Sequence, residues 1–209
     1  MKIIKSIEEL ERYFVDDVEK LVYKDDGGIK KIELIDDDFK ILCDIKTEKS
    51  IYARGSLYVA GSLETDGDLI FEENGKEDIV YIKVLGNLKV GKDLISIGNG
   101  EVSALGEIDV SGDIEVNWIF GRNITAKGHI SVGGCISSDG DIVSGAFIDC
   151  QNMIRADGNI IAKEYINIDF NNQKIFAGLW DDCEESAGMI SCKKLNATVG
   201  HGKVRVNPD

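Results

Sequence analysis

Aliphatic residues recur every six positions through the middle of the chain. The longest unbroken run contains Ile124, Ile130, Ile136, Ile142, Ile148, Ile154, Ile160 and Ile166. Glycine often stands two positions before the aliphatic residue, and a small or β-branched residue stands two positions after it, so the unit reads G-x-[IL]-x-[VAST]-x. A period of six does not match the 3.6-residue turn of an α-helix. The pattern therefore predicts short β-strands.

The three marked positions share one parity, and alternate side chains of a strand point to the same face. We expect the aliphatic and small residues to point inward, and the residues between them, such as Asp109 and Ser131, to face solvent. Glycine at the joint would allow a corner conformation or a close approach of the backbone. Six residues per side and three sides give roughly 18 residues per coil. The expected fold is all-β: a single-stranded parallel β-helix, or β-solenoid, with about six coils over residues 51–170.

Two segments interrupt this period. Residues 72–81 contain charged residues without the aliphatic spacing, which indicates a looped-out insertion. Residues 118–121, with the sequence WIFG, break the register between Ile114 and Ile124 and indicate a wider corner or a bulge.

The segments outside the repeat are expected to close the ends of the solenoid. Residues 1–50 combine a helical apolar pattern with strand-like alternation, and we interpret them as an α+β N-terminal cap. Residues 171–209 lose the glycine rhythm, and we interpret them as a C-terminal cap. A solenoid needs such caps because its terminal strands otherwise present unpaired edges.

Composition and charge narrow the function. The chain has 209 residues and a net charge of −14, from 24 basic and 38 acidic residues. This balance argues against binding nucleic acid or an anionic membrane, since both need a basic surface. No membrane-spanning stretch or secretory signal is evident, and five cysteines without paired CxxC spacing favour neither disulfides nor zinc. A cytoplasmic location is the simplest expectation.

Catalytic motifs are absent from the sequence. The two histidines, His129 and His201, belong to no nucleophile–base pattern, and no phosphate-binding loop or metal motif appears. Carboxylate pairs such as Asp139 and Asp141 could serve a glycosidase or bind calcium, or could simply form a solvated acidic surface. We favour the surface, because no aromatic cluster accompanies them. We therefore expect no enzymatic activity, no cofactor and no metal.

One set of residues suggests a contact surface. With coils of about 18 residues, His129, Phe147 and Tyr165 would stack in one outward column. Exposed apolar patches usually mark contact surfaces, although residues 171–209 could equally fold back over this one. The candidate partner-binding residues are Phe147, Tyr165, Val143, Ile161 and Met153, together with the acidic loop residues Asp181, Asp182, Glu184 and Glu185.

The repeat resembles a known family. Segments such as GSLYVAGSLETDGDL (55–69), GEIDVSGDIEV (106–116) and GHISVGGCISSDGDI (128–142) resemble the bactofilin-like polymer-forming proteins of bacteria, over about residues 51–170. The resemblance implies a right-handed β-helix that assembles end to end into cytoskeletal filaments without nucleotide. The chain departs from that family in its long flanking segments. A second resemblance, to the left-handed hexapeptide acyltransferases, would place a catalytic histidine at His129, but here glycine precedes the aliphatic residue instead of following it.

Two functions are compatible with these features. The first is an acidic protein-binding solenoid, most specifically an immunity or inhibitor protein that masks a basic protein such as a nuclease toxin. The second is a bactofilin-like scaffold that self-associates, which would make the chain a homo-oligomer. The expected caps favour the first.

Overall fold

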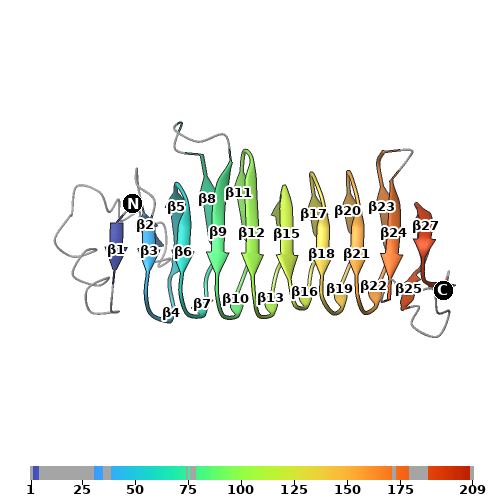
Figure 1. The fold of residues 1–209 in the computed structure, drawn as a ribbon, viewed down its shortest axis with the longest axis horizontal. Helices are drawn as coiled ribbons and strands as arrows, with labels where there is room; N and C mark the ends of the chain where they lie inside the picture. Colours follow the sequence, from blue (N-terminus) through green and yellow to red (C-terminus); the bar gives the residue numbers. More distant parts are fainter. Residues whose placement is uncertain are drawn as a thin grey trace.

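The structure is a computed structural model that describes residues 2–4, 31–34, 39–73, 75, 79–170, 173–178 and 188–207, the first two segments by their backbone alone. The described strands form three parallel sheets that run along the long axis (Figure 1). Sheet A contains β1 (Lys2–Ile4), β3 (Phe39–Ile41), β6 (Leu57–Val59), β9 (Val80–Val84), β12 (Gly100–Ala104), β15 (Trp118–Gly121), β18 (Ile136–Ser138), β21 (Ile154–Ala156), β24 (Lys174–Ala177) and β27 (Thr198–His201). Sheet B contains β2 (Lys31–Leu34), β5 (Ser50–Arg54), β8 (Leu69–Glu72), β11 (Leu94–Ile97), β14 (Ile114–Val116), β17 (Ile130–Val132), β20 (Ile148–Cys150), β23 (Tyr165–Ile168) and β26 (Lys194–Asn196). Sheet C contains β4 (Ile45–Thr47), β7 (Leu63–Thr65), β10 (Leu88–Val90), β13 (Ile108–Val110), β16 (Ile124–Ala126), β19 (Ile142–Ser144), β22 (Ile160–Ala162), β25 (Met189–Cys192) and β28 (Lys203–Val206).

The chain visits the sheets in the order A, C, B, so each coil contributes one strand to each sheet. The expected β-solenoid is confirmed, with about eight turns of about 18 residues. Six of these turns, from β6–β8 to β21–β23, lie within residues 51–170. Register is kept from coil to coil, as Ile130 pairs with Ile148 and Ile148 with Ile166.

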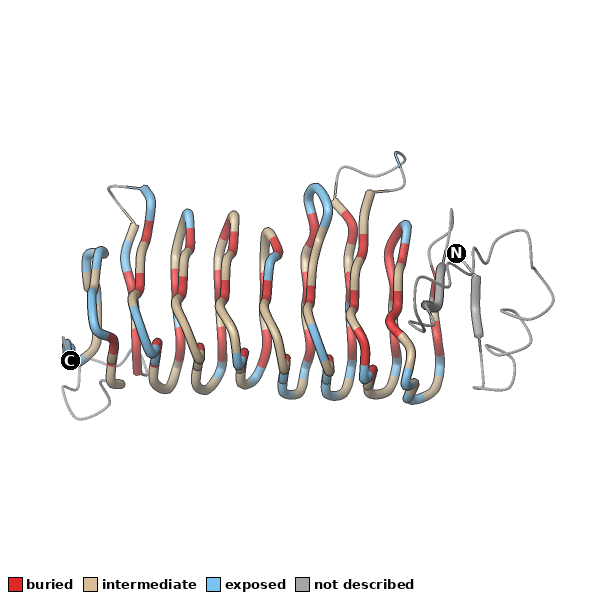
Figure 2. The backbone as a smooth tube through the Cα atoms, turned by 180° about the vertical axis from the view of Figure 1, so that it is seen from behind, coloured by how far each residue is buried: buried red, intermediate tan, exposed pale blue. Residues whose placement is uncertain are grey.

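The six-residue period fills the interior. Residues of the long isoleucine run, such as Ile124, Ile136 and Ile160, are completely buried in one continuous apolar cluster. The small residues two positions later, Val110 and Ala156 among them, are buried as well, while exposed residues alternate with them along the strands (Figure 2). Burying an aliphatic side chain stabilises a fold by about 1.5–3 kcal/mol, so stacking coils supplies the stability that no single coil has.

The glycines of the repeat serve close packing between coils. Positive φ values occur at Gly55, Gly75, Gly98, Gly178 and Gly202, and the corner glycines of the repeat other than Gly55 are not among them. Of the two explanations suggested by the sequence, the close approach is therefore the one that applies at these corners.

Six corner glycines approach a polar side chain of the preceding coil. We call these side chains corner acceptors; each immediately precedes a strand of sheet B or C, and they are Asp44, Asn87, Asp93, Asp113, Asn123 and Asp141. Each accepts a hydrogen bond from a backbone N–H one coil further on; the bond from Asp113 N to Asp93 Oδ1, for example, is 2.8 Å long. A Cβ atom added at Gly112 would overlap Asp93 Oδ1. The glycine thus leaves room for the acceptor that ties its coil to the previous one.

The two interruptions of the period have different outcomes. The expectation of a wider corner or a bulge at residues 118–121 was wrong: Trp118–Gly121 is strand β15, paired in register with β12 and β18, with Ile119 completely buried. The period breaks there because the corner between β14 and β15 is the single residue Asn117. At the other interruption, β8 ends at Glu72 and β9 begins at Val80, and the pairing of Leu57 with Ile82 resumes the register beyond the inserted residues.

The three sheets extend beyond residues 51–170 on both sides. Strands β3 and β4 pair with β6 and β7, and strands β24–β28 continue the same sheets towards the C-terminus. The helical pattern expected near the N-terminus lies outside the described residues, and the assignment of the two flanks as caps stays a prediction. Within the described part of the chain, no helix has the length and hydropathy needed to cross a bilayer.

We expect Gly112→Ala to lower the free energy of unfolding by about 2 kcal/mol, because the new methyl group must displace the Asp93 carboxylate from its hydrogen bond. Gly133→Ala is the matched control, since its Cβ would meet Asn117 Nδ2 at 3.2 Å and no atom more closely. Urea denaturation measures both. In an Asp93→Ala background the Gly112→Ala substitution should cost clearly less, and an equal cost in both backgrounds would show that the carboxylate is not what requires glycine.

Candidate functional site

An aromatic column lies on the corner between sheets C and B. His129, Phe147 and Tyr165 stand at equivalent positions in three successive coils. The centroids of neighbouring rings are 4.7 Å apart, and the interplanar angles are 8° for His129–Phe147 and 2° for Phe147–Tyr165. The structure therefore brings together the column that the 18-residue repeat predicts.

The rings of this column stack face to face on one another. His129 closes one end, with Nδ1 3.0 Å from Asp113 Oδ1 and Nε2 3.1 Å from Glu115 Oε1. When both nitrogens carry a proton, each donates to one carboxylate. Stacked rings contribute about 0.5–1.5 kcal/mol per pair, and the faces they cover cannot stack on a ligand. The column accordingly stabilises neighbouring coils, and both faces of its central ring, Phe147, are covered by the other two rings.

The other apolar candidates do not join the column in one patch. Val143 and Ile161 are neighbours in the outward column of sheet C, and Ile161 is exposed. Met153 lies at the corner that leads from sheet B to sheet A. The polar outward column of sheet B, which includes Asp149, separates Met153 from Phe147. The acidic loop candidates Asp181, Asp182, Glu184 and Glu185 lie outside the described residues.

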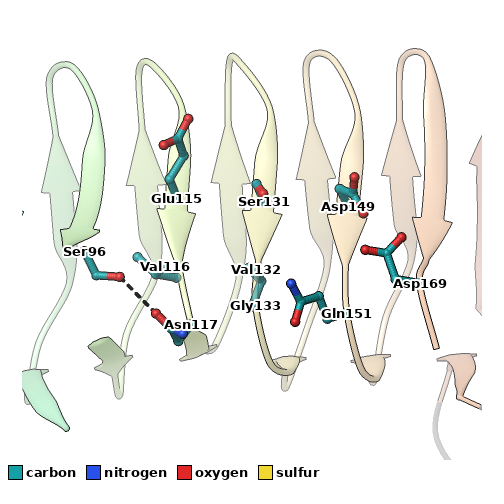
Figure 3. Close-up of a pocket in the computed structure, with 10 residues that line it drawn as sticks. All are labelled: Ser96, Glu115, Val116, Asn117, Ser131, Val132, Gly133, Asp149, Gln151 and Asp169. Carbon is teal, nitrogen blue, oxygen red and sulfur yellow. Dashed lines mark hydrogen bonds between the residues drawn. The ribbon is translucent and has the colours of Figure 1, made fainter. Parts of the chain in front are cut away.

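A shallow groove follows sheet B and the corner beyond it. Its volume is about 370 Å³, and it spans several coils (Figure 3). The lining residues are Ser96, Glu115, Val116, Asn117, Ser131, Val132, Gly133, Asp149, Gln151 and Asp169. We call this feature the sheet B groove.

Two columns of the solenoid build the groove. Glu115, Ser131 and Asp149 are in register at the outward position of β14, β17 and β20. Gln151 and Asp169 follow strands β20 and β23 at the corner. The repeat thus sets polar side chains side by side at the coil spacing, and Figure 3 shows them projecting from successive coils.

Asn117 forms a one-residue corner within the groove. Its Oδ1 accepts hydrogen bonds from the Ser96 hydroxyl at 3.4 Å and from the Gly100 backbone N–H at 3.3 Å. This corner brings β15 directly after β14.

The groove carries negative charge. Its lining includes the carboxylates of Glu115, Asp149 and Asp169 and contains no lysine or arginine. Tyr165 lies beside it, and partial desolvation, followed by the charges of Asp149 and Glu164, raises the pKa of its hydroxyl. Carboxylates flanked by amide and hydroxyl groups are suited to binding ammonium and guanidinium groups.

The described residues offer little support for nucleophilic catalysis or metal binding. No group of three or more His, Cys, Asp or Glu side chains among them is arranged to hold a metal ion. Cys150 is completely buried, as the repeat predicts, and its thiol lies 3.0 Å from the Gly134 carbonyl. Burial raises the pKa of Cys150 to about 12.

The groove is the candidate site that sequence reasoning missed. Its lining residues are scattered from position 96 to 169, and the irregular corners after β11 and β14 shift them out of the six-residue count. The signal was available in Glu115, Ser131 and Asp149, which follow one another once the coils are aligned on Ile114, Ile130 and Ile148.

Comparison with protein-family models, with curated proteins and with solved structures gives no match.

We expect Cys150 to resist alkylation in the folded protein. With a pKa of about 12, roughly one Cys150 thiol in ten thousand is ionised at pH 8, and burial blocks the reagent as well. Mass spectrometry after iodoacetamide treatment should find Cys150 unmodified in native protein and modified in urea, with the half-buried Cys135 as the internal control. Modification of Cys150 at the rate of Cys135 in native protein would contradict its placement in the core.

Proposed function

We propose that this chain is a non-enzymatic protein-binding solenoid whose sheet B groove takes up a basic protein. The observation that carries the proposal is the groove itself, in which Glu115, Asp149 and Asp169 line one shallow concavity without a basic residue. The net charge of −14 supports it, because long-range attraction steers a basic partner towards an acidic surface.

The shape of the groove favours a protein over a small molecule. It is open and shallow, and its lining is polar, whereas small-molecule sites are usually enclosed and largely apolar. Side chains repeated at the coil spacing present several acceptors in a row, which suits a partner with several lysine or arginine side chains. Nucleic acid and anionic membranes are disfavoured by the same charge.

The most specific form of the proposal is an immunity or inhibitor protein. Such a protein needs to cover a basic surface, such as that of a nuclease toxin, without performing chemistry. The acidic groove and the inert Cys150 are compatible with this role, and a cytoplasmic location would suit it.

A groove variant with Glu115→Gln, Asp149→Asn and Asp169→Asn tests the binding surface. We expect its affinity for an oligoarginine peptide at about 0.1 M salt to fall about tenfold, because each lost pair contributes up to about 1 kcal/mol. The control carries Glu48→Gln, Asp66→Asn and Asp139→Asn, three exposed carboxylates away from the groove, and has the same net charge. Isothermal titration calorimetry measures both variants.

The comparison separates local binding from general attraction. We expect the control to bind within about twofold of the unmodified protein, since distant charges are largely screened. If both variants lose affinity equally, only the net charge attracts the peptide and the groove is not the site.

A second function, the bactofilin-like scaffold, is favoured by one observation at the C-terminal end. Val204 and Val206 pair with the buried Ile190 and Cys192, so they continue two inward columns of sheet C. Both valines are nevertheless exposed. The end strand β28 therefore offers apolar side chains and a strand edge to a further coil, which an adjoining copy could supply.

For this second function we expect that Val204→Asp with Val206→Asp abolishes end-to-end polymers, because charges cannot enter an apolar coil interface. Ile161→Asp, at an exposed position on the side of sheet C, is the control and should leave polymers intact. Negative-stain microscopy distinguishes the outcomes. Discrete particles of the unmodified protein would rule out the scaffold, and binding of a basic protein would remain as the proposed function.

A further inference from the structure

An exposed apolar ridge lies on the corner between sheets A and C, away from the sheet B groove. Leu42, Leu85 and Leu105 have exposed fractions of 44%, 49% and 71%. Ala60 lies between the first two in the coil order and is also exposed. We call these four residues the leucine ridge.

The fold aligns the ridge coil by coil. Its members immediately follow β3, β6, β9 and β12, which are successive strands of sheet A. Backbone hydrogen bonds align them: the N–H groups of Ala60, Leu85 and Leu105 donate to the carbonyls of Ile41, Val59 and Val84 in the preceding coils. Three exposed leucines in a line, on a chain with a net charge of −14, form an apolar patch of the kind that marks an interface.

Charged residues flank the ridge on sheet C in alternating order. Lys46, Glu64, Lys89 and Asp109 occupy the outward position of β4, β7, β10 and β13, in register. Glu64 Oε1 lies 3.2 Å from both Lys46 Nζ and Lys89 Nζ. The column therefore reads positive, negative, positive, negative over the same four coils as the ridge.

This order is complementary to its own reverse. We propose that the leucine ridge is the interface for a second copy of this chain, which runs antiparallel along it. In that arrangement Leu42 lies opposite Leu105 of the second copy, and Ala60 lies opposite Leu85. On sheet C, Lys46 then faces Asp109 of the second copy and Glu64 faces Lys89, so every charge of the column meets an opposite charge.

The residues on sheet A agree with the antiparallel direction. Their outward column is Lys40, Tyr58, Lys83 and Ser103. The antiparallel arrangement sets Lys40 opposite Ser103 and Tyr58 opposite Lys83, without like charges. A parallel two-fold arrangement would instead bring the sheet A column of one copy beside the sheet C column of the other, with lysine against lysine at two of the four levels. Like charges in contact disfavour that alternative.

The first test is the mass of the species in solution. Sedimentation equilibrium over a wide range of concentration should show the unmodified protein passing from one chain to two. Leu85→Glu with Leu105→Glu should remain a single chain at every concentration, because the introduced carboxylates cannot be buried between the ridges. Ile97→Glu, at another exposed apolar position, is the control and should dimerise like the unmodified protein. Thermal melting verifies that all three proteins are folded.

A charge reversal tests the direction. Asp109→Lys alone places lysine opposite Lys46 of the second copy and should weaken the dimer about tenfold. Adding Lys46→Asp gives the order negative, negative, positive, positive, which is again complementary to its reverse, so dimerisation should recover. A purely structural effect of Asp109→Lys would not be rescued in this way.

Three results would overturn the proposal. They are a single-chain species of the unmodified protein at all concentrations, a dimer that survives the leucine substitutions, and a charge reversal without recovery. The second result would assign the association to another surface, such as the end strand β28.

Discussion

The contact between a corner glycine and a polar side chain of the preceding coil sets the geometry of this solenoid. Asp93, for example, accepts the backbone N–H of Asp113 in the next coil, while Gly112 leaves the space that its carboxylate needs. This hydrogen bond satisfies the backbone N–H of a corner residue, which lies outside the strand pairing. It also fixes the distance and register between coils. The core then follows, because coils in register stack isoleucine on isoleucine.

The same register turns outward positions into columns, and these columns are where functional surfaces can form. Residues far apart in sequence become neighbours at the coil spacing, so carboxylates and other polar side chains from several coils line one acidic groove, and leucines at one corner form a ridge. The aromatic column uses the same principle for stability, because its rings stack on one another. Three corners and three faces give one chain several independent surfaces.

The sequence predicted the interior well because one rule, the six-residue period, governs most inward positions. It predicted the aromatic column for the same reason, since His129, Phe147 and Tyr165 lie in coils of regular length. It failed at residues 118–121, where a corner of one residue shortens the coil and moves Ile119 to an unexpected place in the count. The groove and the leucine ridge span such irregular coils, and their columns become visible only after strand pairing aligns them.

The most direct test of the account is carbodiimide footprinting of the carboxylates, with and without the oligoarginine peptide. Modification of each Asp and Glu is read by mass spectrometry, so all acidic faces are compared in one experiment. We expect Glu115, Asp149 and Asp169 to be protected by the peptide, while Glu48 and Asp66 react as before. Uniform protection, or protection confined to Glu48 and Asp66, would contradict the assignment of the sheet B groove as the binding surface.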